Sequence, residues 1–67
     1  MMMTPLPSFT EQKKNAMVLY FDTEGASPQD VERRVTAAYA CYSAVGVVKK
    51  DGKTFVALEI DGVDEDL

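Results

Sequence analysis

Apolar positions gather in separate segments of the chain, and two of these segments have the composition of β-strands. Residues 16–21 form a continuous run that is rich in β-branched and aromatic side chains. Residues 47–60 contain two apolar stretches separated by Asp51-Gly52, a dipeptide that suits the two positive φ values of a type I′ turn. We therefore predict one strand at 16–21 and a β-hairpin at 47–60.

The Asp51-Gly52 turn also predicts the register of this hairpin. With these two residues as the loop, Val48 lies opposite Phe55 and Val47 lies opposite Val56. Successive side chains of a strand point to opposite faces, so the hairpin has two distinct sets of side chains. The set predicted to lie under a helix is Val47, Val56, Leu58 and Ile60. The set on the other face is Val48, Phe55, Ala57 and Glu59.

A helix is predicted between the first strand and the hairpin. Ser27 can cap its amino end, Pro28 suits the first helical position, and Asp30 complements the positive end of the helix dipole. Apolar residues then recur at steps of three and four along one face: Val31, Val35, Ala38, Tyr42 and Val45. Since Gly46 is a natural stop, we expect a helix of about 17 residues.

These elements follow the order β-α-β-β, which predicts a single small α+β domain. We expect a three-stranded, mainly antiparallel sheet in the spatial order 2-3-1, because the third strand is the more apolar half of the hairpin, with the helix packed on one face. An alternative order has the second strand in the centre, as a direct right-handed crossover. The domain is assigned to residues 11–62, between a flexible N-terminal arm, 1–10, and an acidic C-terminal tail, 63–67.

Chain length limits how this domain is stabilised. A chain of 67 residues buries only roughly 60% of the surface that its unfolded form exposes, so such domains often need a disulfide, a metal or a partner subunit. Cys41 is the only cysteine, and histidine, the commonest metal ligand, is absent. We therefore expect self-association and no cofactor, and the lone thiol favours the reducing cytoplasm.

Charge and hydropathy weaken two classes of partner. The net charge of −4 opposes electrostatic attraction to nucleic acid or to an anionic membrane. No apolar run approaches the roughly 18 residues that cross a bilayer, and the amino terminus lacks the pattern of a secretory signal. We therefore expect no contact with a membrane.

Candidate catalytic groups are few. A nucleophile such as Cys41 has no histidine to activate it, and its place beside the apolar face of the predicted helix indicates a packed thiol. Asp22 and Glu24 are the best pair of carboxylates, but a small sheet with one helix offers little cleft to bury them. We predict that the protein is not an enzyme and that it has no catalytic, cofactor-binding or metal-binding residues.

The face of the sheet away from the helix is the leading candidate for function. If Met17, Leu19 and Phe21 point into the core, an apolar patch faces outward, and such patches commonly mark protein interfaces. The candidate interface residues are Val18, Tyr20, Val48, Phe55 and Ala57. We predict a protein-protein interaction module, a homodimer that packs sheet to sheet or edge to edge and binds another protein. The competing interpretation is that Leu6 or Phe9 of the arm folds across the patch.

Two other functions remain as alternatives. The first is a small acidic inhibitor of the kind that phages and mobile elements encode, which mimics nucleic-acid charge with acids near the helix start. These acids are Asp22, Glu24, Asp30 and Glu32. The second is a binder of single-stranded nucleic acid, with Tyr20 and Phe55 stacking on bases beside lysines of the hairpin tip. These lysines are Lys49, Lys50 and Lys53.

Overall fold

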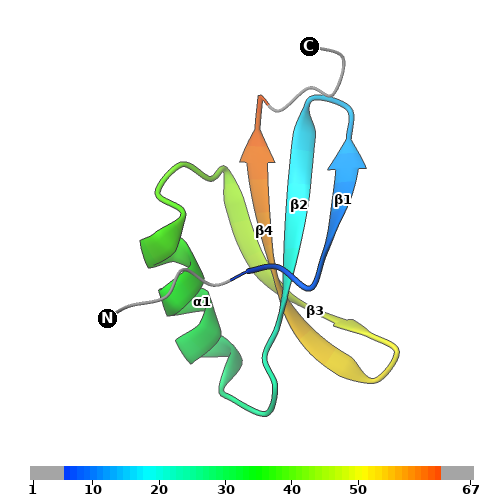
Figure 1. Ribbon diagram of the computed structural model, residues 1–67, viewed down its shortest axis with the longest axis vertical. Coiled ribbons are helices and arrows are strands. Elements are labelled where there is room, and N and C mark those ends of the chain that lie inside the picture. Colours follow the sequence, from blue (N-terminus) through cyan, green and yellow to red (C-terminus); the bar gives the residue numbers. More distant parts are fainter. Residues whose placement is uncertain (1–5, 63–67) are drawn as a thin grey trace.

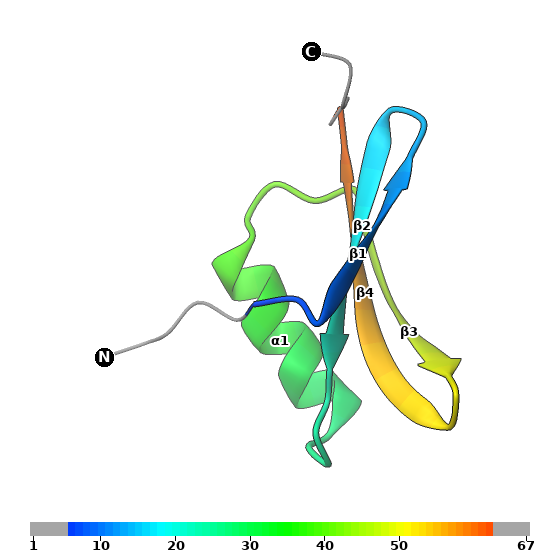
Figure 2. The same ribbon diagram turned by 45° about the vertical axis from the view of Figure 1, so that its right-hand side comes forward.

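One helix lies against one face of a four-stranded antiparallel sheet in the computed structural model of the protein, which describes residues 6–62 (Figure 1). The elements are β1 (Phe9–Lys13), β2 (Ala16–Asp22), α1 (Pro28–Ala38), β3 (Ala44–Lys50) and β4 (Lys53–Asp61). The strands are arranged in the order β1-β2-β4-β3. Figure 2 views the sheet nearly edge on and shows α1 on one side of it, which makes this an α+β fold with one covered and one open face.

All predicted strands are present, although β3 begins at Ala44 and not at Val47, but the prediction of three strands is wrong. The first, second and third predicted strands correspond to β2, β3 and β4, and β4 lies between the other two with antiparallel neighbours. The additional strand, β1, pairs with the outer edge of β2. It begins at Phe9, within the range assigned to a flexible arm. Residues 1–5 of that arm and all of the acidic tail, 63–67, lie outside the described residues.

Strand β1 was not predicted because its side chains show almost no apolar pattern. Phe9 is followed by Thr, Glu, Gln and Lys, so no alternation of apolar and polar residues marks a half-buried strand. The local signal is the two-residue connection to β2, where Asn15 has a φ of 70°. Asparagine tolerates this left-handed conformation better than most residues.

The predicted register of the β3–β4 hairpin is confirmed. Val48 lies opposite Phe55 and Val47 opposite Val56, with Lys50 and Lys53 flanking the turn. Asp51 and Gly52 have φ values of 54° and 77°, as a type I′ turn requires.

Helix α1 begins as predicted at Pro28 but ends at Ala38, so the predicted length is wrong. Ser27 is extended and its side chain makes no capping hydrogen bond, although its carbonyl accepts one from the Val31 N–H. Residues 44–50 pair with β4, and this pairing draws Val45 into the sheet opposite Leu58. The spacing of Val45 thus satisfied a helical period by coincidence, because sheet pairing overrides that local preference.

The core lies between α1 and the covered face of the sheet. It consists of Leu19, Phe21, Val31, Val35, Val56 and Leu58, with Met17, Tyr39, Val45 and Ile60 packed against it. The inward orientation predicted for alternate residues of β2 and β4 is therefore confirmed. Val47, which was predicted to lie under the helix, is 50% exposed because the shortened helix does not cover this part of β3.

Leu58 and Leu6 provide a matched pair for testing this core. Leu58 is fully buried, whereas Leu6 is 82% exposed. We expect Leu58→Ala to lower the free energy of unfolding by about 3 kcal/mol, through lost transfer energy and a residual cavity. Leu6→Ala, the same chemical change, should alter it by less than about 0.5 kcal/mol. Urea unfolding followed by far-UV circular dichroism measures both, and equal effects would contradict the described core.

Candidate interface on the open sheet face

All predicted interface residues lie on the open face, which is the side of the sheet away from α1. Tyr20 lies opposite Ala57, Val48 lies opposite Phe55, and Val18 shares the side of Tyr20 two residues along β2. The register also brings further residues to this face. These are Phe9, Glu11 and Lys13 of β1, Ala44 and Gly46 of β3, and Glu59 of β4.

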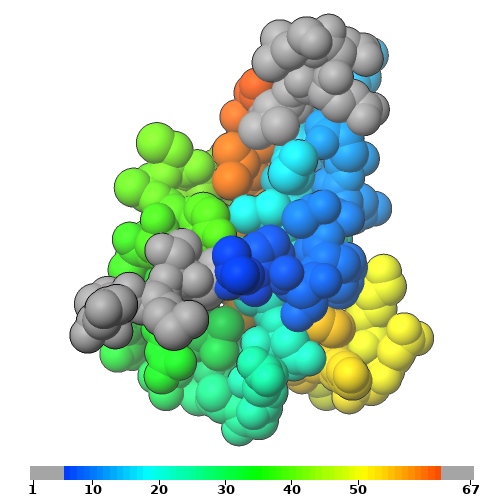
Figure 3. All heavy atoms as spheres, viewed as in Figure 1, coloured from blue at the N-terminus to red at the C-terminus, as the bar shows by residue number. Residues whose placement is uncertain are grey.

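Phe9 covers one end of the open face. Its ring stacks on that of Tyr20, with the centroids 4.5 Å apart, and meets the Phe55 ring edge to face at 5.3 Å. In the space-filling view, the start of β1 (blue) lies beside β2 and the tip of the β3–β4 hairpin (cyan and yellow; Figure 3). Phe55 is consequently only 7% exposed. The competing interpretation was therefore correct for Phe9, although Phe9 acts from a strand, and Leu6 remains exposed.

Polar groups border this aromatic cluster. The Lys50 ammonium lies 4.9 Å from the centre of the Phe9 ring, a cation–π distance. The Tyr20 hydroxyl donates a hydrogen bond of 2.8 Å to Glu11 Oε1. This hydrogen bond, together with partial burial and the negative charge of Glu11, raises the pKa of Tyr20. Base stacking on Phe55, as the nucleic-acid alternative assumes, would require Phe9 to move.

Beside the aromatic cluster, the open face contains a hollow of about 310 Å³. It exists because three neighbouring positions, Ala44, Gly46 and Ala57, have at most a methyl side chain. A Cβ atom on Gly46 would meet nothing within 4 Å. Taller side chains form its walls, so the hollow is a concave, largely apolar surface. The residues that line it are Lys13, Val18, Tyr20, Ala44, Val45, Gly46, Val48, Ala57 and Glu59.

Most of the predicted interface residues line this hollow. Val18, Tyr20, Val48 and Ala57 do so, although Val18 is only 5% exposed, whereas Phe55 lies under Phe9. Ala44 and Gly46 were missed because both were assigned to the end of the helix. Lys13 and Glu59 add charges of opposite sign to the lining.

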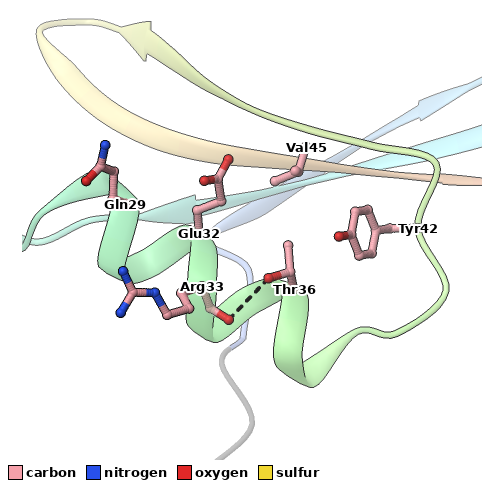
Figure 4. Close-up of a pocket in the computed structure, with 6 residues that line it drawn as sticks. All are labelled: Gln29, Glu32, Arg33, Thr36, Tyr42 and Val45. Carbon is pink, nitrogen blue, oxygen red and sulfur yellow. Dashed lines mark hydrogen bonds between the residues drawn. The ribbon is translucent and has the colours of Figure 1, made fainter.

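A second groove, of about 420 Å³, separates α1 from β3 on the covered side (Figure 4). Side chains at helical spacing form one wall, and Tyr42 and Val45 form the other. The helical wall consists of Gln29, Glu32, Arg33 and Thr36. Sequence reasoning missed this groove because it extended the helix through the residues of the opposite wall.

The candidate catalytic groups lie at a strand end or in connecting segments. Cys41 is exposed in the segment between α1 and β3, so the prediction of a packed thiol is wrong. Asp22 accepts a hydrogen bond from the Glu24 N–H at 2.9 Å, which stabilises the turn after β2. Among residues 6–62, no group of three or more His, Cys, Asp or Glu side chains is arranged to hold a metal ion.

No helix within the described part of the chain is long and apolar enough to cross a membrane. No family model, curated protein or solved structure matches the chain.

The Tyr20–Glu11 hydrogen bond predicts a specific pH dependence. A raised pKa in the folded state means that folding favours neutral Tyr20, so this contribution to stability is complete below the unfolded value of 10.0. It is lost as the pH rises through the raised folded value. In a tyrosinate absorbance titration, the wild-type curve minus that of Tyr20→Phe should show a midpoint above 10.0.

Glu11→Gln should move this midpoint downward, because the carboxylate charge is removed. Glu32→Gln, a change on α1, serves as the matched control and should leave it in place. An unchanged midpoint in Glu11→Gln would show that the hydrogen bond does not perturb Tyr20.

Proposed function

We propose that the protein is a non-enzymatic protein-interaction module that forms a homodimer in which its open sheet face takes part. The hollow over Ala44, Gly46 and Ala57 is the observation that supports this proposal most directly. It is concave, its floor is apolar, and Val48 at its wall is 37% exposed. Exposed apolar surface of this kind commonly marks a protein interface.

The charges at the hollow suit a second copy of the same chain. Lys13 and Glu59 both line it and have opposite signs. A two-fold contact brings the same patch from both subunits together, so an interface must be complementary to itself. A patch with one charge of each sign meets that condition, and a purely acidic or purely basic one does not. The small size of the chain adds a reason to associate, because a thin core gains from additional burial.

A non-enzymatic role agrees with the chemistry of the described residues. Cys41 is the only cysteine, and the chain has no histidine to activate its thiol. We place the dimer in the cytoplasm, as a single free cysteine suggests. The dimer in turn would present its remaining surface to another protein.

Sedimentation velocity across concentrations up to about 300 µM, the range of weak dimers, tests this proposal. We expect a reversible increase in mass from monomer to dimer. Val48→Glu should weaken association at least about tenfold, because it introduces a charge at an apolar wall that must be desolvated. Ala37→Glu adds the same charge at an exposed position of α1, so it is the control and should leave the dissociation constant unchanged. A wild-type chain that remains monomeric throughout would contradict the proposal.

A further inference from the structure

The backbone of β3 forms one open edge of the sheet, and the hydrogen-bond pattern shows which of its groups face outward. The Thr23 N–H donates a hydrogen bond to the Thr54 carbonyl at 3.3 Å. Hydrogen-bonded and non-hydrogen-bonded pairs alternate along an antiparallel ladder, so the next pair, Asp22 and Phe55, is not hydrogen-bonded. In an antiparallel ladder, a residue in such a pair directs its own N–H and C=O toward the opposite neighbour, which for Phe55 is Val48. By alternation, the N–H and C=O groups of Val45, Val47 and Lys49 then point outward from the β3 edge, in the plane of the sheet.

This edge differs from the opposite one in its side chains. Strand β1 is polar after Phe9, whereas β3 is uncharged from Ala44 to Val48 and has its charged residues, Lys49 and Lys50, only at its end. Natural proteins usually protect open edges with charges, prolines or bulges, because an unprotected edge accepts another strand. Strand β3 also lies between two hollows, one on the open face and the groove beside α1 on the covered face. An added strand would therefore find space for its side chains on both faces.

We propose that β3 of a second copy pairs antiparallel with this edge, centred on Val47, to form one continuous sheet across the dimer. The inference rests on the proposed homodimer and places its contact at the β3 edge, so that the open faces of the two copies adjoin and do not stack. Only the register centred on Val47 overlaps the whole of β3 with itself, from Ala44 opposite Lys50 to Lys50 opposite Ala44. In this register the outward groups of Val47 meet those of Val47 of the second copy, as a hydrogen-bonded pair requires.

Side chains on both faces agree with this register. On the open face, Val48 of the second copy lies opposite Gly46 and borders the hollow on its β3 side. On the covered face, the two Val47 side chains lie side by side and bury surface that is 50% exposed in the monomer. Cross-strand pairs of apolar side chains at this spacing stabilise a sheet.

The groove beside α1 supplies charge complementarity. Lys49 of the second copy lies opposite Val45, which lines this groove together with Glu32. Figure 4 shows the Glu32 side chain directed toward the strands and that of Arg33 directed away from them. A lysine that enters along β3 therefore meets the carboxylate, and the two-fold symmetry repeats the contact.

Amide hydrogen exchange tests this arrangement directly. When about nine-tenths of the chain is dimeric, the Val47 amide should exchange about tenfold more slowly than in the dilute monomer. The Thr10 amide is the internal control, because the same alternation places it on the outer edge of β1, and its rate should not change with concentration. Equal exchange of Val47 in monomer and dimer would overturn the inference.

Two sets of variants give an independent readout by sedimentation. Val47→Pro removes an outward N–H, which an edge strand tolerates, and should weaken the dimer at least about tenfold. Thr10→Pro, the matched change on β1, should not. Lys49→Glu and Glu32→Lys should each weaken association, and the double variant should restore it, since the charges are exchanged.

The outcomes separate this inference from the proposed function. A dimer that Val48→Glu weakens, but that neither protects Val47 nor responds to Val47→Pro, overturns the strand pairing and leaves the open-face interface standing. A wild-type chain without a dimer overturns both. Loss of association in the single charge variants without recovery in the double variant counts against the Lys49–Glu32 contact and against this register.

Discussion

The pairing of β3 with β4 is the constraint on which the rest of the structure depends. The Asp51-Gly52 turn sets this register with two residues, and each later pair follows by alternation until Ala44 meets Glu59. Residues 44–47 are thereby committed to the sheet. Helix α1 must then end early enough for the chain to cross back to β3, and it does so at Ala38.

The surface features follow from this early end. Because α1 has 11 residues, it covers part of one face and leaves β3 half open on that face as well. The groove lined by Glu32 and Val45 occupies the space that a longer helix would have filled. The hollow on the other face reflects the same strand, since Ala44 and Gly46 contribute almost no side chain to it. The register set by the hairpin turn thus determines the groove and the hollow that lie on the two sides of β3.

Sequence reasoning succeeded where one local signal decides the structure. The type I′ turn predicted the register, and period-two alternation predicted which residues of β2 and β4 are buried. It failed where two patterns coincide or where a pattern is missing. Val45 fits a helix and a strand equally well, and only pairing with Leu58 decides between them. Strand β1 has a single apolar side chain, Phe9, whose partners Tyr20 and Phe55 are distant in sequence.

In the candidate site, too, the large side chains were predicted and two of the small ones, Ala44 and Gly46, were missed. Large side chains such as Tyr20 and Phe55 attract attention in a sequence, and both do reach the open face. Yet Phe55 is covered, and the shape of the hollow comes from positions with almost no side chain, Ala44, Gly46 and Ala57. A concave surface is a property of neighbouring strands taken together, so it emerges only once the register is known.

Stability and association are linked in a domain of this kind. Helix α1 and Phe9 each cover part of one sheet face. The exposed valines, Val47 and Val48, lie on β3, whose outward backbone groups form an open edge. Any partner that binds the folded chain and not the unfolded one stabilises the fold by mass action. Pairing along β3 would satisfy the outward N–H and C=O groups and bury Val47 in one step. The open edge of the monomer is therefore the part with most to gain from a second copy, which is why we propose the interaction there.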